Sequence, residues 1–124
     1  MSKTIMIPHA QGNYTPGQYI SSEVAIPAGK TQCEFMINRQ KWTDTGLDVA
    51  NFIIETSFDN GLTWPDKVSF SLKGGNIIDD RTGVPRAVNA VSFGLLDNSN
   101  PNRKIRVISN IVSAINCKSN LRII

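Results

Sequence analysis

Apolar and polar residues alternate along much of this chain with a period of two. Residues 68–73 read Val-Ser-Phe-Ser-Leu-Lys, and the segments 31–38, 91–96 and 104–109 follow nearly the same rule. A period of two is typical of a strand that turns one face to a core and the other to water. The pattern therefore predicts half-buried β-strands, and we find no segment with the period of a helix.

Turn signals separate these strands at short intervals. The clearest are Pro27-Ala28-Gly29-Lys30, Asn60-Gly61 and the polar run from Asp97 to Asn102. Short strands with turns at regular spacing predict an all-β fold, an antiparallel β-sandwich. The hydrophobic pattern does not separate jelly-roll from immunoglobulin-like strand orders. Cys33 and Cys117 lie too far apart for immunoglobulin spacing, so we favour a jelly-roll-like order.

The first 22 residues do not share the alternating pattern. Four chain-breaking residues interrupt them: Pro8, Gly12, Pro16 and Gly17. We therefore predict an extended N-terminal arm at 1–22 and a single β-sandwich domain at 23–124, so that deletion of the arm would change assembly and leave the domain folded. We also expect a polar loop at 74–85 and two separate final strands at 111–117 and 121–124.

The segment from Ser57 to Trp64 reads Ser-Phe-Asp-Asn-Gly-Leu-Thr-Trp and joins two predicted strands. Asp59 can accept hydrogen bonds from the backbone of the turn that it begins, and Thr63 can add a hydroxyl bond. Asn60-Gly61 tolerates positive φ. Trp64 can cover the loop with a large apolar ring. These residues predict a tightly closed hairpin turn.

This segment resembles the Asp-box, a β-hairpin motif of sialidases and several unrelated β-proteins. The resemblance implies a structural role for Ser57, Asp59, Gly61, Thr63 and Trp64. In those families the motif lies on the outside of the fold, away from the catalytic centre, so no catalytic residue carries over. Only one copy is present, and a propeller would need far more chain.

Charge is unevenly distributed although the formal net charge is only +3. Residues 81–124 hold seven basic residues and one acidic residue, whereas residues 1–80 hold six basic and nine acidic residues. This asymmetry suggests contact with an anionic partner or a neighbouring subunit through Arg103, Lys104 and Arg106, with a solvated strand face as the alternative. Nucleic acid is disfavoured because aromatic residues do not interleave with these basic ones.

The inventory of reactive side chains argues against an enzyme. His9 is the only histidine and lies in the predicted arm, so no Ser-His-Asp or Cys-His arrangement is expected. Cys33 and Cys117 lack metal spacing and are predicted to be buried thiols. Asp79-Asp80 has no EF-hand context. We therefore predict no catalytic residue, no metal and no cofactor. Neither a signal peptide nor an apolar stretch of ~20 residues is evident, so no membrane association is expected.

Two non-enzymatic functions remain. The arrangement of an N-terminal arm, the Ile26-Pro27-Ala28-Gly29 turn, Trp42-Thr43-Asp44-Thr45-Gly46 and one Asp-box hairpin resembles small β-sandwich proteins of bacteriophage virions. That resemblance implies capsid decoration or a head or tail accessory role in the virion, as a homo-oligomer bound to other virion proteins such as the capsid lattice. The alternative is a carbohydrate-binding module in which Trp42, Tyr14 and Tyr19 form an aromatic platform for surface glycans.

Overall fold

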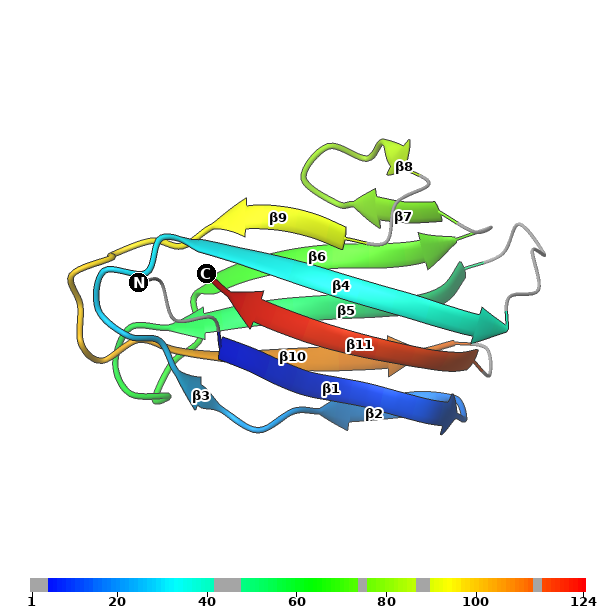
Figure 1. The fold of residues 1–124 in the computed structure, drawn as a ribbon, viewed down its shortest axis with the longest axis horizontal. Coiled ribbons are helices and arrows are strands. Elements are labelled where there is room, and N and C mark those ends of the chain that lie inside the picture. Colours follow the sequence, from blue (N-terminus) through cyan, green and yellow to red (C-terminus); the bar gives the residue numbers. More distant parts are fainter. Residues whose placement is uncertain (1–4, 42–47, 74–75, 87–89, 113–114) are drawn as a thin grey trace.

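The chain forms two antiparallel β-sheets that pack face to face (Figure 1). The computed structural model describes the backbone of residues 5–41, 48–73, 76–86, 90–112 and 115–124, and the side chains of 15–37, 50–73, 76–86, 90–112 and 120–124. No helix occurs in these residues, and hence none that could cross a membrane. The predicted all-β sandwich is confirmed.

Sheet A contains four strands in the order β1-β11-β4-β9. Their bounds are β1 Ile5–Tyr14, β4 Gln32–Lys41, β9 Ala90–Gly94 and β11 Ile115–Ile123. Sheet B follows the order β2-β10-β5-β6-β7-β8, and β3 pairs with β10 on the same edge as β2. Its strands are β2 Gly17–Ile20, β3 Val24–Ala25, β5 Asp48–Ser57, β6 Asp66–Lys73, β7 Asn76–Asp79, β8 Pro85–Arg86 and β10 Lys104–Ile111.

Four antiparallel pairs explain how the chain is wound. β1 pairs with β11, β2 with β10, β4 with β9, and β5 with β6. The first strand thus pairs with the last, and each following pair lies inside the previous pair along the chain. The innermost pair is the β5–β6 hairpin. These pairs alternate between the two sheets, so the chain rolls up as one long antiparallel ribbon. This is the jelly-roll strand order that we favoured from the sequence.

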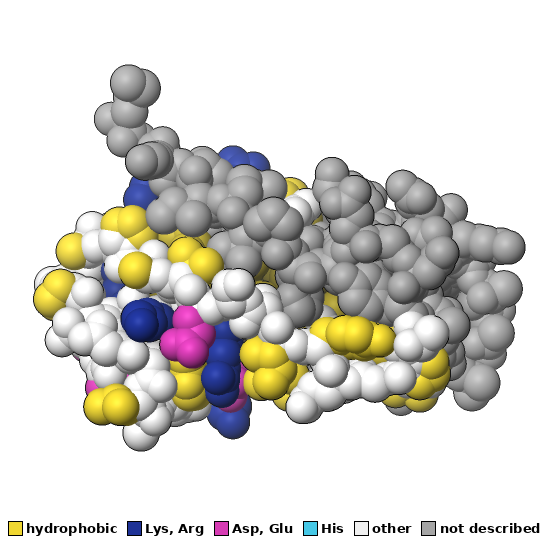
Figure 2. Space-filling model, turned by 90° about the horizontal axis from the view of Figure 1, so that it is seen from below, with side chains coloured by type: hydrophobic (Ala, Val, Ile, Leu, Met, Phe, Trp, Pro, Cys, Tyr) yellow, Lys and Arg dark blue, Asp and Glu magenta, His cyan; other side chains and the backbone are white. Residues whose placement is uncertain are grey.

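The prediction of an N-terminal arm is wrong. Residues 5–14 form β1, which pairs with β11 from Ile5↔Ile123 to Tyr14↔Ile115, and residues 17–20 form β2. Both strands lie on the lower edge in Figure 1, the edge that faces the viewer in Figure 2. Proline is tolerated here because β1 is an edge strand and its register shifts between Pro8 and Ala10. The chain breakers therefore mark edge strands and not an arm.

Two smaller expectations also fail. The segment 74–85, predicted as a loop, contains β7 and reaches β8, which extend sheet B beyond β6. The two final strands are one strand, β11, which runs without interruption from Ile115 to Ile123. Asn116, Ser119 and Asn120 interrupt the apolar alternation of this segment, so the pattern predicted two strands where the backbone forms one.

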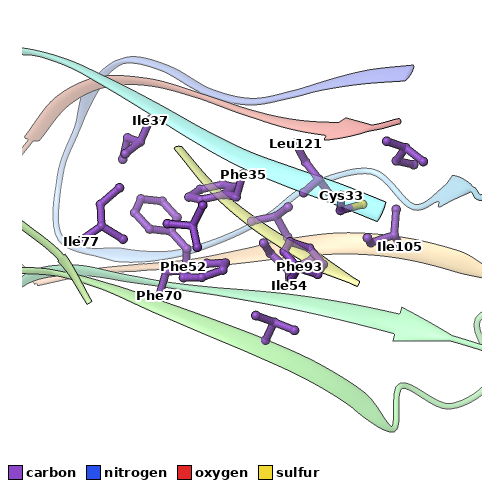
Figure 3. Packing of buried hydrophobic residues seen from close by; sticks show 14 of the residues in the cluster. Cys33, Phe35, Ile37, Phe52, Ile54, Phe70, Ile77, Phe93, Ile105 and Leu121 are labelled. Atoms are coloured by element: carbon purple, nitrogen blue, oxygen red, sulfur yellow. The ribbon is translucent and has the colours of Figure 1, made fainter. Parts of the chain in front are cut away.

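The core lies between the sheets and is built around four phenylalanine rings (Figure 3). The ring centroids of Phe35 and Phe52 are 5.1 Å apart, those of Phe35 and Phe70 are 5.9 Å apart, and those of Phe70 and Phe93 are 6.1 Å apart. Cys33 is fully buried beside them, and burial raises the pKa of its thiol to about 12. Cys33 is therefore an unreactive protonated thiol, as predicted, while the side chain of Cys117 lies outside the described residues.

The pairing of β1 and β2 predicts the result of deleting residues 1–20. The truncated chain would expose the backbone of β11 along its whole length and part of β10. We expect a loss comparable with the total stability of a small domain, about 5–15 kcal/mol, so the truncated protein should be unfolded. Thermal melting followed by circular dichroism measures this. A cooperative transition with an unchanged midpoint would restore the arm interpretation.

Candidate interaction surface

One end of the sandwich is held together by a buried arginine. The Arg103 side chain is 0% exposed. Its Nη1 donates to the carbonyl oxygens of Lys30 and Leu96, each at 3.1 Å. Its Nη2 donates to the carbonyl oxygens of Pro27 at 3.0 Å and Asn98 at 3.2 Å. We call these four bonds the Arg103 cage; they join the β3–β4 loop to the β9–β10 loop.

Backbone bonds reinforce the cage. The N–H of Gly29 donates to the carbonyl of Asn98 at 2.7 Å, and the N–H of Ile26 donates to the carbonyl of Arg103 at 3.0 Å. Burial lowers the pKa of Arg103, but a guanidinium remains charged in proteins. Its charge is therefore compensated by carbonyl dipoles, in bonds stronger than those between neutral groups.

The predicted basic contact site must be corrected at Arg103. A fully buried guanidinium cannot meet an anionic partner. Arg106 is partly available, although its Nε donates to Glu55 Oε1 at 2.9 Å and its guanidinium lies 4.1 Å from the Trp64 ring centroid. Lys104 stays half-buried on the outer face of β10, opposite Ala25 on one side and Ser57 on the other. The charge pattern of the sequence therefore overstates the basic surface.

The 57–64 turn is closed by side-chain oxygens. Ser57 Oγ accepts from the N–H of Gly61 at 2.8 Å and donates to Asp59 Oδ1 at 2.7 Å. Asp59 accepts from the N–H of Thr63 at 2.9 Å and from the Thr63 hydroxyl at 2.6 Å. Asn60 and Gly61 have φ of 61° and 90°. The turn thus has the hydrogen bonds and the left-handed backbone that its residue types predict.

Two side chains lie close to Gly61. A Cβ at this position would meet the carboxylate of Glu23 and lie 3.5 Å from Cζ2 of Trp64. The turn also contacts the β9–β10 loop, because the N–H of Asn60 donates to the carbonyl of Asn102 at 3.0 Å and Asn100 Nδ2 donates to the carbonyl of Phe58 at 3.1 Å. Since the cage holds the same loop, three loops at this end form one connected unit.

A charged row crosses the outer face of sheet B next to this end. Glu55 is buried, and its carboxylate receives Arg106 from β10 on one side and Lys67 Nζ from β6, at 3.1 Å, on the other. Arg106 in turn lies over Trp64.

Two further rows follow along the strands. Strand register places Ile20, Ile108 and Ile53 side by side on β2, β10 and β5, the apolar row. The next row is an amide row of Gln18 and Asn110, joined by a 3.0 Å bond from Gln18 Nε2, and Asn51, whose Nδ2 donates to Ser69 and Ser71. The outer face of sheet B is thus banded: charged, apolar, then neutral and polar.

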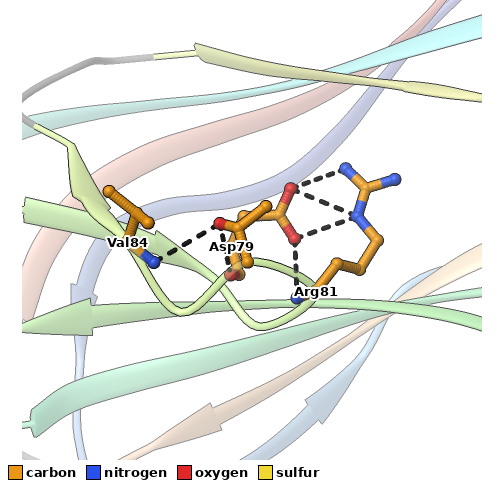
Figure 4. A network of polar contacts seen from close by, with 4 residues as sticks. Asp79, Arg81 and Val84 are labelled. Carbon is orange, nitrogen blue, oxygen red and sulfur yellow. Dashed lines mark hydrogen bonds and ion pairs between the residues drawn. The ribbon is translucent and has the colours of Figure 1, made fainter.

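The β7–β8 connection contains a separate polar network (Figure 4). Asp79 is the last residue of β7, and it is buried. Its carboxylate accepts hydrogen bonds from Arg81 Nη2 at 2.6 Å and from Arg81 Nε at 2.9 Å. These bonds hold the pKa of Asp79 below its usual value. The carbonyl of Asp79 accepts from the N–H groups of Thr82 and Gly83. Asp79 and Arg81 therefore bind each other and stabilise the β7–β8 turn of their own chain.

Of the three residues predicted to form the aromatic platform, only Tyr19 has a side chain within the described residues. Tyr19 is opposite buried Ser109 across β2 and β10, packs against the core, and donates its hydroxyl to the carbonyl of Thr15 at 3.0 Å. Tyr19 therefore faces inward, and its predicted role in an exposed platform is wrong. Trp42 and the side chain of Tyr14 lie outside the described residues. Within the part of the chain that the structure describes, no group of three or more His, Cys, Asp or Glu residues could hold a metal.

Sequence reasoning missed Glu55 and the two neutral rows. Glu55 appears as one acidic residue inside an apolar run, and nothing local indicates that two cations from different strands will reach it. The rows are visible only when strand register is known, because their members come from segments up to 92 residues apart, as Gln18 and Asn110 are.

Comparisons with known proteins bear on the fold. No protein-family model matches the chain, and no curated protein sequence matches it. The solved structure of the infectious bursal disease virus Gx strain is similar with a TM-score of 0.50 and 8% identity; the match covers 98% of this chain and 31% of the viral chain, about a third of its length.

Two other similar structures are more distant. The C-terminal CBM6 of LamC from Zobellia galactanivorans has a TM-score of 0.48 and 13% identity, with 98% of each chain covered. The acid-stable capsid of Helicobacter pylori bacteriophage KHP30 has a TM-score of 0.42 and 12% identity, with 98% of this chain and 86% of that chain covered. These likenesses concern the β-sandwich fold, which by itself does not determine function.

The cage predicts a graded loss of stability. Arg103→Met keeps an unbranched chain but removes the buried donors that four carbonyl groups share, so we expect the free energy of unfolding to fall by about 3–5 kcal/mol. Arg103→Lys keeps the charge with fewer, differently placed donors and should lie between Met and wild type. Urea unfolding measures both. Equal stability of all three proteins would show that the cage contributes nothing.

The 57–64 turn predicts an acid-sensitive contribution. Hydrogen bonds from Thr63 and Ser57 lower the pKa of Asp59 to about 2, below its unfolded value of about 3.9. Its contribution is therefore present above pH ~4 and lost as pH falls towards ~2. Asp59→Asn should lower the melting temperature at neutral pH and flatten its decline between pH ~4 and ~2. Melting curves of the two proteins that stay parallel across this range would contradict the assignment.

Proposed function

We propose that this chain is a non-enzymatic structural protein of a virion, a decoration or accessory part that acts through protein contacts as a homo-oligomer. The observation that carries the proposal is how the charged groups are used. Glu55, Asp59, Asp79 and Arg103 are each bound to other parts of the same chain. Such groups set loops and strands in place; they are not poised to react with a substrate.

The outer face of sheet B supports the same proposal. It spans several strands, and along them its side chains alternate with side chains that point to the core. Broad banded faces of this kind suit contact with another protein surface, where hydrogen bonds and apolar contacts are distributed over a large area. Weak binding by each copy would be strengthened by avidity, because a particle carries many copies.

The bacteriophage resemblance adds support with one feature removed. The N-terminal arm is not present as such, and residues 42–46 lie outside the described residues. The turn at Ile26-Pro27-Ala28-Gly29 and the single hairpin at 57–64 remain, and both belong to one connected end of the sandwich. Tyr19 packs against the core, so the carbohydrate-binding alternative lacks one of its three predicted platform residues. We therefore place the virion role first.

The experiment is quantitative mass spectrometry of particles purified from cultures that carry this gene. We expect the chain in the particle fraction at a fixed ratio to the major capsid protein, on the order of tens of copies or more, because avidity requires repetition. The particle-free supernatant is the control. A chain found only in the supernatant, with none in the particles, would contradict the proposal.

A further inference from the structure

Strand β9 forms one edge of sheet A, and half of its backbone groups point away from the sheet. In the part of the chain that the structure describes, β9 pairs with β4 alone. The N–H of Leu95, just after β9, donates to the carbonyl of Thr31 at 2.8 Å. Bonded positions alternate along an antiparallel pair, so the N–H and C=O groups of Ala90, Ser92 and Gly94 point outward.

These outward groups are accessible. Gly94 is exposed, and a Cβ added there would meet no atom within 4 Å. Since glycine has no side chain, its exposed surface is the backbone itself. Ser92 is exposed as well, whereas the carbonyl of Leu96 is already bound by Arg103 Nη1 at 3.1 Å. The open backbone therefore ends at Gly94, and it offers N–H and C=O groups that an extended strand can pair with.

The other sheet edges carry features that oppose strand addition. β1 contains Pro8, and its register shifts beside that residue. β2 and β3 are short and separate, and β8 is two residues long and contains Pro85. Prolines, bulges and short strands are common means by which an edge avoids pairing with another chain. β9 has five residues with no proline and no charge, and its pairing with β4 has no register shift.

We propose that β9 pairs antiparallel with β9 of a second copy, around a two-fold axis at Ser92. Ser92 is then opposite Ser92 of the second copy, and Ala90 is opposite Gly94 of the second copy. The outward N–H and C=O groups of all three residues bond across the axis. The two four-stranded sheets become one sheet of eight strands. The contact is isologous and closes as a dimer.

The outline of this edge suits a second copy in that orientation. Figure 1 shows β8 and the chain that leads into it projecting beyond the first residues of β9, while no strand is drawn beyond its last residues. A two-fold axis at Ser92 exchanges the two ends of β9. The projecting β7–β8 segment of each copy therefore lies beside the open end of the other copy, so the two edges interlock.

The side chains of β9 also match those of a second β9. Ser92 lies opposite a serine, and serine pairs hydrogen-bond across strands. On the core side, Val91 lies opposite Phe93 of the second copy, so apolar meets apolar. No like charges face each other, because the strand carries none. The inference deepens the proposed function and rests on its expectation that copies of the chain associate.

The test is sedimentation velocity of the full chain over a concentration series. We expect the wild-type mass to reach twice the 13.6 kDa of one chain. Ser92→Lys sets two lysines opposite each other at the axis and should weaken the dimer by about 10-fold. Asn120→Lys is the matched control, because Asn120 lies on the same outer face of sheet A but on β11, an interior strand. It should leave the dimer unchanged.

A mixture of two variants tests the position of the axis. Ser92→Glu should weaken self-association as Ser92→Lys does, whereas an equimolar mixture of the two should form a heterodimer at least as stable as the wild-type dimer. Recovery by mixing requires residue 92 of one copy to face residue 92 of the other. Circular dichroism melts of each variant, which should match wild type, confirm that the fold is retained.

Three results would overturn the inference. They are a wild-type chain that stays at 13.6 kDa at every concentration, an oligomer that Ser92→Lys and Asn120→Lys affect equally, or a mixture of the Lys and Glu variants that associates no better than either alone. Particle mass spectrometry separates this inference from the proposed function. A monomeric chain that is still present in particles would defeat the β9 interface alone.

Discussion

The guanidinium of Arg103 is the constraint on which one whole end of this molecule depends. It has no exposed surface. Its donors reach the carbonyls of Pro27 and Lys30 in the β3–β4 loop and those of Leu96 and Asn98 in the β9–β10 loop, about 70 residues later in the chain. A buried charge is unfavourable unless such bonds satisfy it. These two loops therefore keep their positions. The 57–64 turn is also held in place, because it binds the same β9–β10 loop.

The jelly-roll topology connects that end to the rest of the sandwich. Arg103 directly precedes β10, which pairs with β2, β3 and β5 and so occupies the interior of sheet B. A loop unit held at the start of β10 sets where its outer residues lie, from Arg106 to Asn110. The banded face therefore has a fixed geometry. A passive binding protein benefits from this rigidity, because little conformational freedom is lost when a partner binds.

Local chemistry could be read from the sequence, and long-range pairing could not. Alternation identified the strands around Phe70, Phe93 and Val107, and the residue types of the 57–64 turn indicated its hydrogen bonds. The N-terminal strands were missed because proline and glycine are tolerated on edges and at bulges. Arg103 looked like surface charge because nothing next to it shows that loops distant in sequence will enclose it. The rows on sheet B depend on register, which a turn signal does not reveal.

Amide hydrogen exchange of the wild-type protein, followed residue by residue, tests most directly whether Arg103 holds these loops as one unit. We expect the amides of Ile26, Gly29 and Asn60, which donate to Arg103, Asn98 and Asn102, to be protected to nearly the same extent as those of β10. Exchange of these three amides at the rate of open loops, while β10 remains protected, would contradict it. The cage would then be a local contact and not the constraint that organises this end of the fold.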